Sequence, residues 1–445
     1  MIRLSSVAIT AALLLSGCGG SDSTPGEQGT VELCQQTTLN ARIGCELERN
    51  YLWYRELRKP NPASFSDPQQ YFNASLALRD TYSFMLTEQE YQDRFINAVF
   101  FGFGFATQRV DNGAALQLLY VYPQSSAAEQ GLKRGDKIVS IEGISVSEWL
   151  SGLDSGRYTN EDIYGPNQAG IVRNFVWQQV DGTEQRADVV KSQVTTNTVL
   201  HRSVSQVNGR NIGYLVFNSF IELSETELEQ AFAYFSQQQI DDLILDLRYN
   251  GGGLIRVANQ LSSHIAYNQL QGKVFVKYRY NDKNSASNNT VVFSPGQGRT
   301  LLNLPRVFVL TTPGSCSSSE LVINSLSPFI DVIQIGQPTC GKPVGQIPTP
   351  VANFRLFAIN FQTVNALDFG DYFDGLIPNC PVNPAVVGDW GVENDPLYAA
   401  AVEYIRLGRC QAVSVASSAA TPLGLLQQAA AAARNQPSWR FYNEQ

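Results

Sequence analysis

Two polar residues between Arg306 and Gln346 have the types and the spacing needed for nucleophilic catalysis, and Ser317 is the first. It follows a short apolar run, residues 306–311, that predicts a buried strand, and a Pro-Gly break separates it from that run. A helical pattern begins at about Ser318, so the serine lies where a strand gives way to a helix. A capping box with Glu320, three residues on, would explain the same spacing without catalysis.

Lys342 is the second of these residues. The buried strand pattern DVIQIGQ leads to it, and it lies in a Pro/Gly turn where glycine neighbours allow a substrate close to the backbone. A lysine can replace histidine as the base for a serine if burial lowers its pKa from about 10.4 toward neutrality. Serine and lysine pairs are a known variant of the serine triad. The two residues therefore predict acyl-transfer chemistry.

A third stretch, DDLILDLRYNGGGL, offers backbone amides to the same chemistry. Residues 243–247 predict a buried strand that opens into Gly251-Gly252-Gly253, where the backbone can approach a ligand closely. A phosphate loop would need a GK[ST] ending, which is missing here, and a plain turn is the other alternative.

The motif GSCSSSEL followed by GQPTCGKPVGQ resembles the paired signature of the C-terminal processing peptidases, which are S41-type serine endopeptidases. This resemblance implies that Ser317 is the nucleophile and that Lys342, 25 residues later, is the general base. It implies further that Gln346 orients the lysine. Pro328 occupies a position where some relatives carry an aspartate, so no acidic third member is expected.

The same resemblance assigns the oxyanion hole to two backbone N–H groups, those of Gly252 and Ser318. Each such donor typically contributes about 3 to 4 kcal/mol to transition-state stabilisation. The adjacent glycines remain alternatives to Gly252, and Ser315, Ser318 and Ser319 are rivals to the nucleophile by composition alone. The two histidines, His201 and His264, lie in no recognisable catalytic context and are expected to be structural.

Composition limits the classes of function. The chain has 445 residues, 43% hydrophobic and 16% charged, which is typical of a soluble globular protein of about two or three domains. A formal net charge of −8 provides no basic surface for nucleic acid, so that partner is not expected. No cofactor is expected, and no CxxC or HxxxH spacing indicates a metal site.

The N-terminus has the features of an export signal. Residues 1–18 carry one arginine, an apolar run too short to span a membrane, and LSGC, which resembles the bacterial lipobox. Cys18 is then the expected lipidation site, residues 19–30 form a tether, and Gly19 favours the periplasmic face of the outer membrane. A plain secretory signal with an incidental cysteine is the alternative.

Export to an oxidising compartment permits disulfides, and removing Cys18 from the seven cysteines leaves six. Two pairs would pin the ends of the protein, and a third would join the segments that carry Ser317 and Lys342. The expected pairs are Cys34 with Cys45, Cys380 with Cys410, and Cys316 with Cys340. Metal binding by these cysteines is the competing interpretation.

Residues 31–98 have helical periodicity and resemble the N-terminal helical segment of the peptidase family. Residues 99–194 contain VYPQSSAAEQGLKRGDKIVSIEGISV, which resembles part of a PDZ domain. Within FFGFGFA, residues Gly102, Phe103 and Gly104 lie where a PDZ domain captures a chain terminus by strand addition. Core packing would explain the aromatic alternation equally.

Residues 195–410 alternate strands and helices, which predicts an α/β fold with a mixed sheet covered by helices. The family resemblance implies that this region is the S41-type peptidase core. A capping box at Ser224 and Glu227 is expected to open a helix that ends near Gln238. Residues 281–298 are expected to form a polar loop, and residues 411–445 an alanine-rich extension.

The combined expectation is an exported serine endopeptidase that captures the C-terminal tails of proteins or peptides. The alternative is a catalytically inactive peptide-binding lipoprotein, because a fold by itself does not establish activity. An esterase or amidase of the α/β-hydrolase class would need a GxSxG elbow, which is missing around Ser317. The sequence assigns no oligomeric state.

Overall fold

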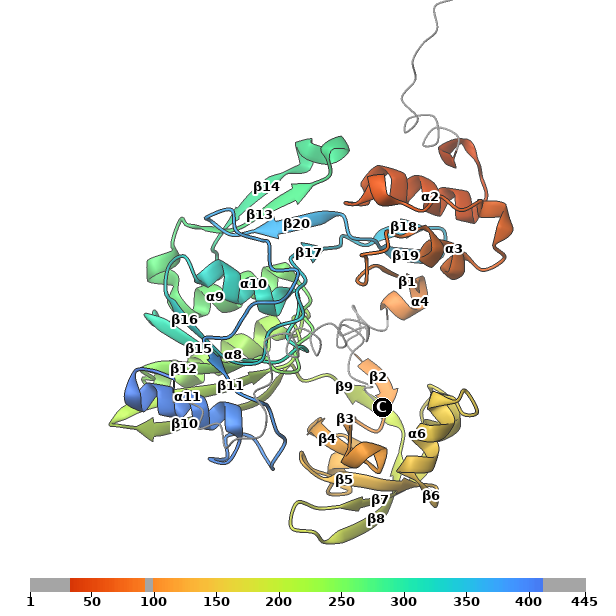
Figure 1. The fold of residues 1–445 in the computed structure, drawn as a ribbon. Helices are drawn as coiled ribbons and strands as arrows, with labels where there is room; N and C mark the ends of the chain where they lie inside the picture. Colours follow the sequence, from red (N-terminus) through yellow and green to blue (C-terminus); the bar gives the residue numbers. More distant parts are fainter. Residues whose placement is uncertain (1–32, 93–98, 411–445) are drawn as a thin grey trace, which may run out of the picture.

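The computed structural model describes residues 33–92 and 99–410. The expected signal peptide, Cys18, the tether and the C-terminal extension lie outside these ranges. Within them, no helix has the length and apolar character required to cross a bilayer. Figure 1 shows the arrangement of the described elements.

A six-stranded mixed sheet forms the centre of residues 195–410. β10 runs antiparallel to β11, and the remaining neighbours are parallel, as the βαβ rhythm predicted. The strands, in spatial order, are β10 (Val199–Val207), β11 (Arg210–Phe217), β12 (Asp242–Asp246), β15 (Arg306–Thr311), β16 (Asp331–Gly336) and β21 (Cys380–Pro381).

Helices cover both faces of this sheet. Alternate side chains explain the two layers, since Val307 and Val309 enter one core while Phe308 and Leu310 enter the other. With both faces buried, the central strands read as continuous apolar runs. α8 (Ser224–Gln237), α9 (Ile255–Leu270) and α10 (Ser318–Leu326) pack on the first core, and α11 (Pro396–Leu407) packs on the second.

The parallel strands bring the candidate motifs to one edge of the sheet. The glycine run follows β12, the serine turn follows β15, and the lysine turn follows β16. Carboxyl ends of neighbouring parallel strands meet at the same edge, where open α/β sheets bind their ligands. The three motifs, distant in sequence, therefore converge.

The N-terminal segment is less purely helical than expected. Its helices are α2 (Leu39–Asn50), α3 (Pro68–Ser75) and α4 (Glu88–Tyr91), with short 3-10 turns at Tyr54–Glu56 and Pro62–Ser64. It also contains β1 (Phe84–Thr87), which pairs with β19 (Phe354–Phe357), and β19 pairs with β18 (Thr349–Val351). A four-residue strand with a partner so distant in sequence gives little local signal.

Residues 99–194 fold mostly as β-strands around a hydrophobic core of their own. We call them the β-rich unit. Its main sheet has the order β3-β4-β5-β7-β8, so β3 lies at an edge. Its strands are β2 (Val99–Gly102), β3 (Phe105–Val110), β4 (Ala115–Val121), β5 (Lys137–Ile141), β6 (Ile144–Ser145), β7 (Val172–Gln178), β8 (Glu184–Val190) and β9 (Ser192–Thr195). Its helices are α5 (Ser126–Glu129), α6 (Val146–Asp154) and α7 (Asn160–Tyr164).

Two local expectations in the core are wrong. The residue before α8 is Leu223, and the Ser224 hydroxyl accepts from the Ile221 N–H instead of capping the helix, while Glu227 binds the N–H groups at the start of β10. The expected polar loop at 281–298 contains β14 (Asn289–Val292). This strand belongs to a second sheet of order β14-β13-β20-β17, with β13 (Val274–Tyr280), β20 (Phe361–Val364) and β17 (Val344–Gly345).

All three expected disulfides are present. Cys34 bonds to Cys45 within the N-terminal segment, and Cys380 of β21 bonds to Cys410 beyond α11. Cys316 bonds to Cys340, which joins the turn after β15 to the turn after β16. The third bond lies directly between the segments that carry Ser317 and Lys342.

Candidate active site

Ser317 occupies a sharp turn at the start of α10. Its backbone angles are φ 57 and ψ −111, a left-handed conformation that is uncommon for a residue with a side chain. Such strain persists where the surrounding structure fixes it, and serine nucleophiles on strand-to-helix turns are held in this way. The side chain is half-buried, so its hydroxyl remains accessible at the edge of the sheet.

The other serines of the motif donate their hydroxyl protons to the glycine loop or the strand before it. Ser315 donates to the Leu247 carbonyl at 2.8 Å, and Ser319 donates to the Asn250 carbonyl at 2.8 Å. Ser318 donates to the Gly253 carbonyl at 2.7 Å. In the described structure, Ser317 donates its hydroxyl proton to no such carbonyl. The three rival hydroxyls are therefore engaged in hydrogen bonds of a kind that Ser317 does not make.

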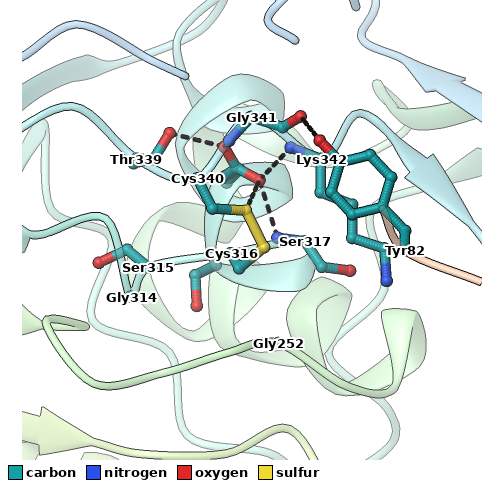
Figure 2. The surroundings of a disulfide bond; sticks show 12 residues. Tyr82, Gly252, Gly314, Ser315, Cys316, Ser317, Thr339, Cys340, Gly341 and Lys342 are labelled. Carbon is teal, nitrogen blue, oxygen red and sulfur yellow. Dashed lines mark hydrogen bonds between the residues drawn. A yellow bond between two sulfur atoms is a disulfide. The ribbon is translucent and has the colours of Figure 1, made fainter. Parts of the chain in front are cut away.

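Glu320 connects the serine turn to the lysine turn. Its carboxylate accepts from the Ser317 N–H at 2.8 Å, so the expected capping interaction exists alongside the catalytic arrangement. It also accepts from the N–H groups of Gly341 and Lys342 at 2.7 and 2.9 Å and from the Thr339 hydroxyl at 2.6 Å (Figure 2). Burial raises the pKa of Glu320, although the donors oppose this effect.

The Cys316–Cys340 disulfide is a second, covalent link between the same two turns (Figure 2). The sulfur atoms lie with a Glu320 oxygen inside a cluster of 4.8 Å, a spacing that could hold a metal ion if the thiols were free. Because both sulfurs are used in the disulfide, Glu320 alone could act as a ligand. The cluster is therefore a structural link in this state.

Lys342 is almost completely buried, with 7% of its surface exposed. Its Nζ donates to Gln346 Oε1 at 3.0 Å, and it lies 5.7 Å from the centre of the Tyr82 ring. Burial lowers the pKa of Lys342 to about 8, against the opposing attraction of Asp80 and Glu320. A large fraction of the lysine is therefore neutral slightly above neutral pH, as a general base requires.

The Ser317 hydroxyl and the end of the Lys342 side chain point to the same region beside the Tyr82 ring (Figure 2). No hydrogen bond joins the two groups in the described structure, where the lysine donates to Gln346. Catalytic hydrogen bonds are often loose before substrate binds and tighten in the complex. The structure thus brings the predicted pair to one site without direct contact.

Gly252 lies against Ser317 and Ser318. A Cβ at this position, where φ is 104, would be 2.7 Å from Ser317 Cβ and 3.0 Å from the Ser318 nitrogen. The Gly252 N–H donates to Asn250 Oδ1 at 2.9 Å in this structure. An incoming oxyanion would therefore compete with this side chain for the Gly252 N–H.

In the β-rich unit, Phe103 is fully buried and packs on Phe105 and Phe175. Core packing, the alternative raised by the aromatic pattern, therefore accounts for its side chain. Gly104 has φ 91 and leaves no room for a side chain, since a Cβ would be 2.1 Å from Ser125 Cβ. Gly102 ends β2, opposite Ser192 of β9. The carbonyls of Phe103 and Gly104 accept from the N–H groups of Ala127 and Tyr122, so a ligand at this run would have to use the run's backbone N–H groups.

Sequence reasoning missed two residues that contact the lysine end of the site. Tyr82 contacts both ends of the lysine turn, and Asp80 is one of the two acids that act on Lys342. Both lie in the N-terminal segment, which has no motif of its own. The Asn250 side chain was also missed, although it belongs to the recognised LRYNGGG run.

Two protein-family models match parts of this chain, and the matched parts contain the residues of the site. A model described as peptidase family S41 matches residues 211–382, which include Ser317, Lys342 and Gln346. A model described as the peptidase S41 N-terminal domain matches residues 38–84, which include Asp80 and Tyr82.

Known relatives are distant in sequence. A carboxyl-terminal-processing protease of Picosynechococcus sp. is 25% identical over 339 residues, 74% of this chain and 76% of that protein. The carboxy-terminal processing protease CtpB of Bacillus subtilis is 24% identical over 296 residues, 65% of this chain but only 57% of the relative. A solved structure described as a candidate S41 protease from Bacteroides fragilis is 25% identical, with a TM-score of 0.67 over 82% of this chain and 97% of that one.

Proposed function

Because the chain carries the domain of peptidase family S41, and on that ground is a serine-type peptidase, we propose that Ser317 and Lys342 are its catalytic dyad. The observation that carries this proposal is a buried lysine, its pKa lowered to about 8, whose side chain ends near the one serine of the motif that donates to no loop carbonyl. Gln346 orients the lysine through the hydrogen bond to its Nζ.

In this mechanism neutral Lys342 removes the hydroxyl proton of Ser317 as the oxygen attacks the scissile carbonyl. The resulting ammonium then gives its proton to the leaving amine, and an acyl enzyme remains on Ser317. Water, activated by the again neutral lysine, releases the acyl group. One group thus acts first as base and then as acid, which histidine does in the Ser-His-Asp triad.

The oxyanion of the tetrahedral intermediate is assigned to the N–H groups of Ser318 and Gly252. Ser318 opens α10, so its N–H is at a helix N-terminus that favours negative charge. For Gly252 to donate, its N–H must leave Asn250 Oδ1. The neighbouring glycines remain alternatives, because the loop offers several amides at the same edge of the sheet.

The proposed substrates are proteins or peptides, with their C-terminal tails bound by the β-rich unit. Its β3 is an edge strand and follows directly after the FGFG run, an arrangement suited to adding an extended peptide to the sheet. The relatives named as carboxyl-terminal processing proteases support the same substrate class. A tail peptide with a free carboxylate should bind more tightly than its amidated form.

Export and lipid anchoring at Cys18 are part of the proposal, with the protein on the periplasmic face of the outer membrane. Three disulfides support an oxidising compartment, because the cytosol keeps most thiols reduced. Cys18→Ser should release the mature protein from the membrane fraction, and radiolabelled fatty acid should label only the unchanged chain.

The dyad is tested with an unfolded protein substrate and a peptide that carries a free C-terminus. Ser317→Ala should abolish cleavage but retain peptide binding, and Lys342→Ala should lower kcat by at least about 100-fold. Two exposed or remote replacements, Ser327→Ala and Lys273→Ala, serve as controls and should keep wild-type rates. Full activity of either dyad variant would refute the assignment.

The alternative function is a peptide-binding protein without catalysis. It predicts that the wild-type chain binds tails at the β-rich unit but cleaves none of them. Sequencing new C-termini in cells that carry wild-type or Ser317→Ala protein separates the two functions. Identical sets of termini would favour the binding protein.

A further inference from the structure

The N-terminal segment closes the lysine end of the site. β1 pairs with β19, and the N-terminal core packs against Val344, Val351 and Ile359, all shortly after Lys342 in sequence. Tyr82 lies two residues before β1 and is 8% exposed. The strand pairing therefore fixes this tyrosine beside the lysine turn.

Tyr82 contacts both ends of that turn. Its hydroxyl donates to the Gly341 carbonyl at 2.6 Å (Figure 2), and its own carbonyl accepts from Gln346 Nε2 at 2.8 Å. Between these contacts the ring covers the Lys342 side chain, with Nζ 5.7 Å from the ring centre. One residue from outside the peptidase core thus holds the segment from Gly341 to Gln346.

The contact with Gln346 decides which atom of the amide faces the lysine. A neutral amine has two N–H donors and one lone pair, and only the lone pair can accept the proton of Ser317. Since the Tyr82 carbonyl can only accept, it holds the NH₂ group of Gln346 and turns Oε1 toward Lys342. A reversed amide would donate to the lone pair and block the base.

Burial and two acidic residues act on the charge of the lysine. Asp80 and Glu320 favour the ammonium, while burial disfavours it and is the larger effect. Asp80 is held by the Tyr51 hydroxyl at 2.6 Å and by the N–H of Tyr82 at 2.8 Å. The tyrosine ring supplies part of the burial, so without it water would reach the amine.

We propose that Tyr82 is a positioning residue for Lys342, because its carbonyl sets the orientation of the Gln346 amide, its hydroxyl holds the turn at Gly341, and its ring excludes water from the amine. This inference rests on the proposed role of Lys342 as the general base. It also gives the N-terminal segment a direct part in the reaction, beyond support of the fold.

The experiment titrates Lys342 without using catalysis. In Ser317→Ala protein, acetic anhydride at a series of pH values labels neutral amines, and mass spectrometry of the peptide that contains Lys342 gives its apparent pKa. We expect a value near 8 in the parent and an increase of at least about one pH unit in Tyr82→Leu. Tyr71→Phe, a change in the same N-terminal core away from the lysine, should leave the value unchanged.

A second variant keeps the test decisive if Tyr82→Leu does not fold. Tyr82→Phe retains the ring and the carbonyl but loses the bond to Gly341, so the labelling pKa should stay near 8. With Ser317 present, its kcat should fall severalfold while KM is unchanged. A wild-type kcat would contradict the role of this contact.

The two proposals fail in different ways. A parent protein whose Lys342 titrates at the ordinary lysine value near 10.4 would refute the general base, and the further inference with it. A parent value near 8 that Tyr82→Leu leaves unchanged would refute the positioning role alone. Circular dichroism of each variant establishes that the fold is intact before the values are compared.

Discussion

Lys342 determines the pH dependence of the proposed reaction. Its pKa is lowered to about 8 by burial, and the neutral form is the active base. The fraction of neutral lysine therefore increases as pH rises through about 8, and kcat should increase with it by about tenfold per unit below that value. Initial rates between pH 6 and 9 with a saturating peptide measure this, and a flat profile would contradict a titrating base.

Removing the charge of Asp80 should shift the pKa of Lys342 in the direction opposite to the shift caused by removing the Tyr82 ring. Its negative charge raises the pKa of Lys342, so Asp80→Asn should lower that pKa and shift the kcat profile toward acid pH. The asparagine retains an oxygen that can accept from the N–H groups of Tyr82 and Ser83. The measurement is the midpoint of the kcat profile.

If Asp80→Asn and Tyr82→Leu shifted the pKa of Lys342 in the same direction, the cause would be general damage to the site. The matched control is Asp67→Asn at the start of α3, since the Asp67 carboxylate caps that helix and does not act on the lysine. It should leave the midpoint in place.

At the scale of single residues, the sequence motifs supplied the groups proposed to react, whereas the residues that act on Lys342 carried no such signal. Ser317, Lys342 and Gln346 belong to spaced motifs whose chemistry can be read from residue type. Tyr82 and Asp80 have no such pattern, because their role comes from strand pairing between β1 and β19. Long-range contacts of this kind leave no local signal.

At the scale of elements, the glycine loop and the nucleophile turn are packed too closely for a side chain at Gly252. Gly252→Ala would place a Cβ 2.7 Å from Ser317 Cβ and 2.8 Å from the Cys316 carbonyl. Displacing the nucleophile by about 1 Å can reduce the rate about 100-fold, so kcat should fall by this order. Single-turnover cleavage measures the effect.

Gly272→Ala is the matched control for Gly252→Ala. Both glycines have positive φ, but a Cβ at Gly272 meets nothing within 4 Å. Backbone strain is therefore common to both variants, and only Gly252→Ala adds the clash. Similar losses of kcat in the two variants would show that strain, and not the contact with Ser317, causes the effect.

The Cys316–Cys340 disulfide should position the dyad as well as stabilise the fold. Replacing both cysteines with alanine removes a link across 24 residues, which contributes about 3 kcal/mol to the free energy of unfolding. Glu320 still joins the two turns, so kcat should decrease severalfold and not vanish. Thermal unfolding and kcat are measured together.

The Cys380–Cys410 pair provides the comparison, because it lies at β21 and beyond α11. Its replacement with alanines should lower the melting temperature while kcat stays at the wild-type value. Equal kcat in both double variants would limit the Cys316–Cys340 bond to a role in stability.

Strong local signals predicted the elements well where burial and turn chemistry agree. Residues 306–311 form β15 as expected, and α10 begins at Ser318 as expected. The capping box at Ser224 failed because Glu227 binds the start of β10, a partner that helix periodicity cannot reveal. Competition from distant N–H donors for the Glu227 carboxylate decided the outcome.

At the scale of the whole molecule, a buried arginine joins the β-rich unit to the peptidase core. Arg134 donates to the Gly388 carbonyl, lies 4.1 Å from the centre of the Trp390 ring, and is 3.6 Å from Asp395. Asp395 also pairs at 2.8 Å with Arg248, which is two residues before Asn250 of the glycine loop. The contact between the units is therefore continuous with the glycine loop that follows β12.

Arg134→Met should weaken this contact while keeping an unbranched, apolar side chain at the position. Asp395 retains its ion pair with Arg248, so its carboxylate is not left unpaired. The contact should lose about 1 to 3 kcal/mol of stabilising free energy, which corresponds to the hydrogen bond and the ring contact of Arg134. Hydrogen exchange should accelerate at residues 386–390 and at 132–136, where the two units meet.

Arg186→Met, an exposed change on β8 of the same unit, should leave exchange unchanged at both segments. If the two variants exchange alike, the units are held together by their other contacts, such as the Tyr120 and Tyr249 rings, and Arg134 has no separate part in docking.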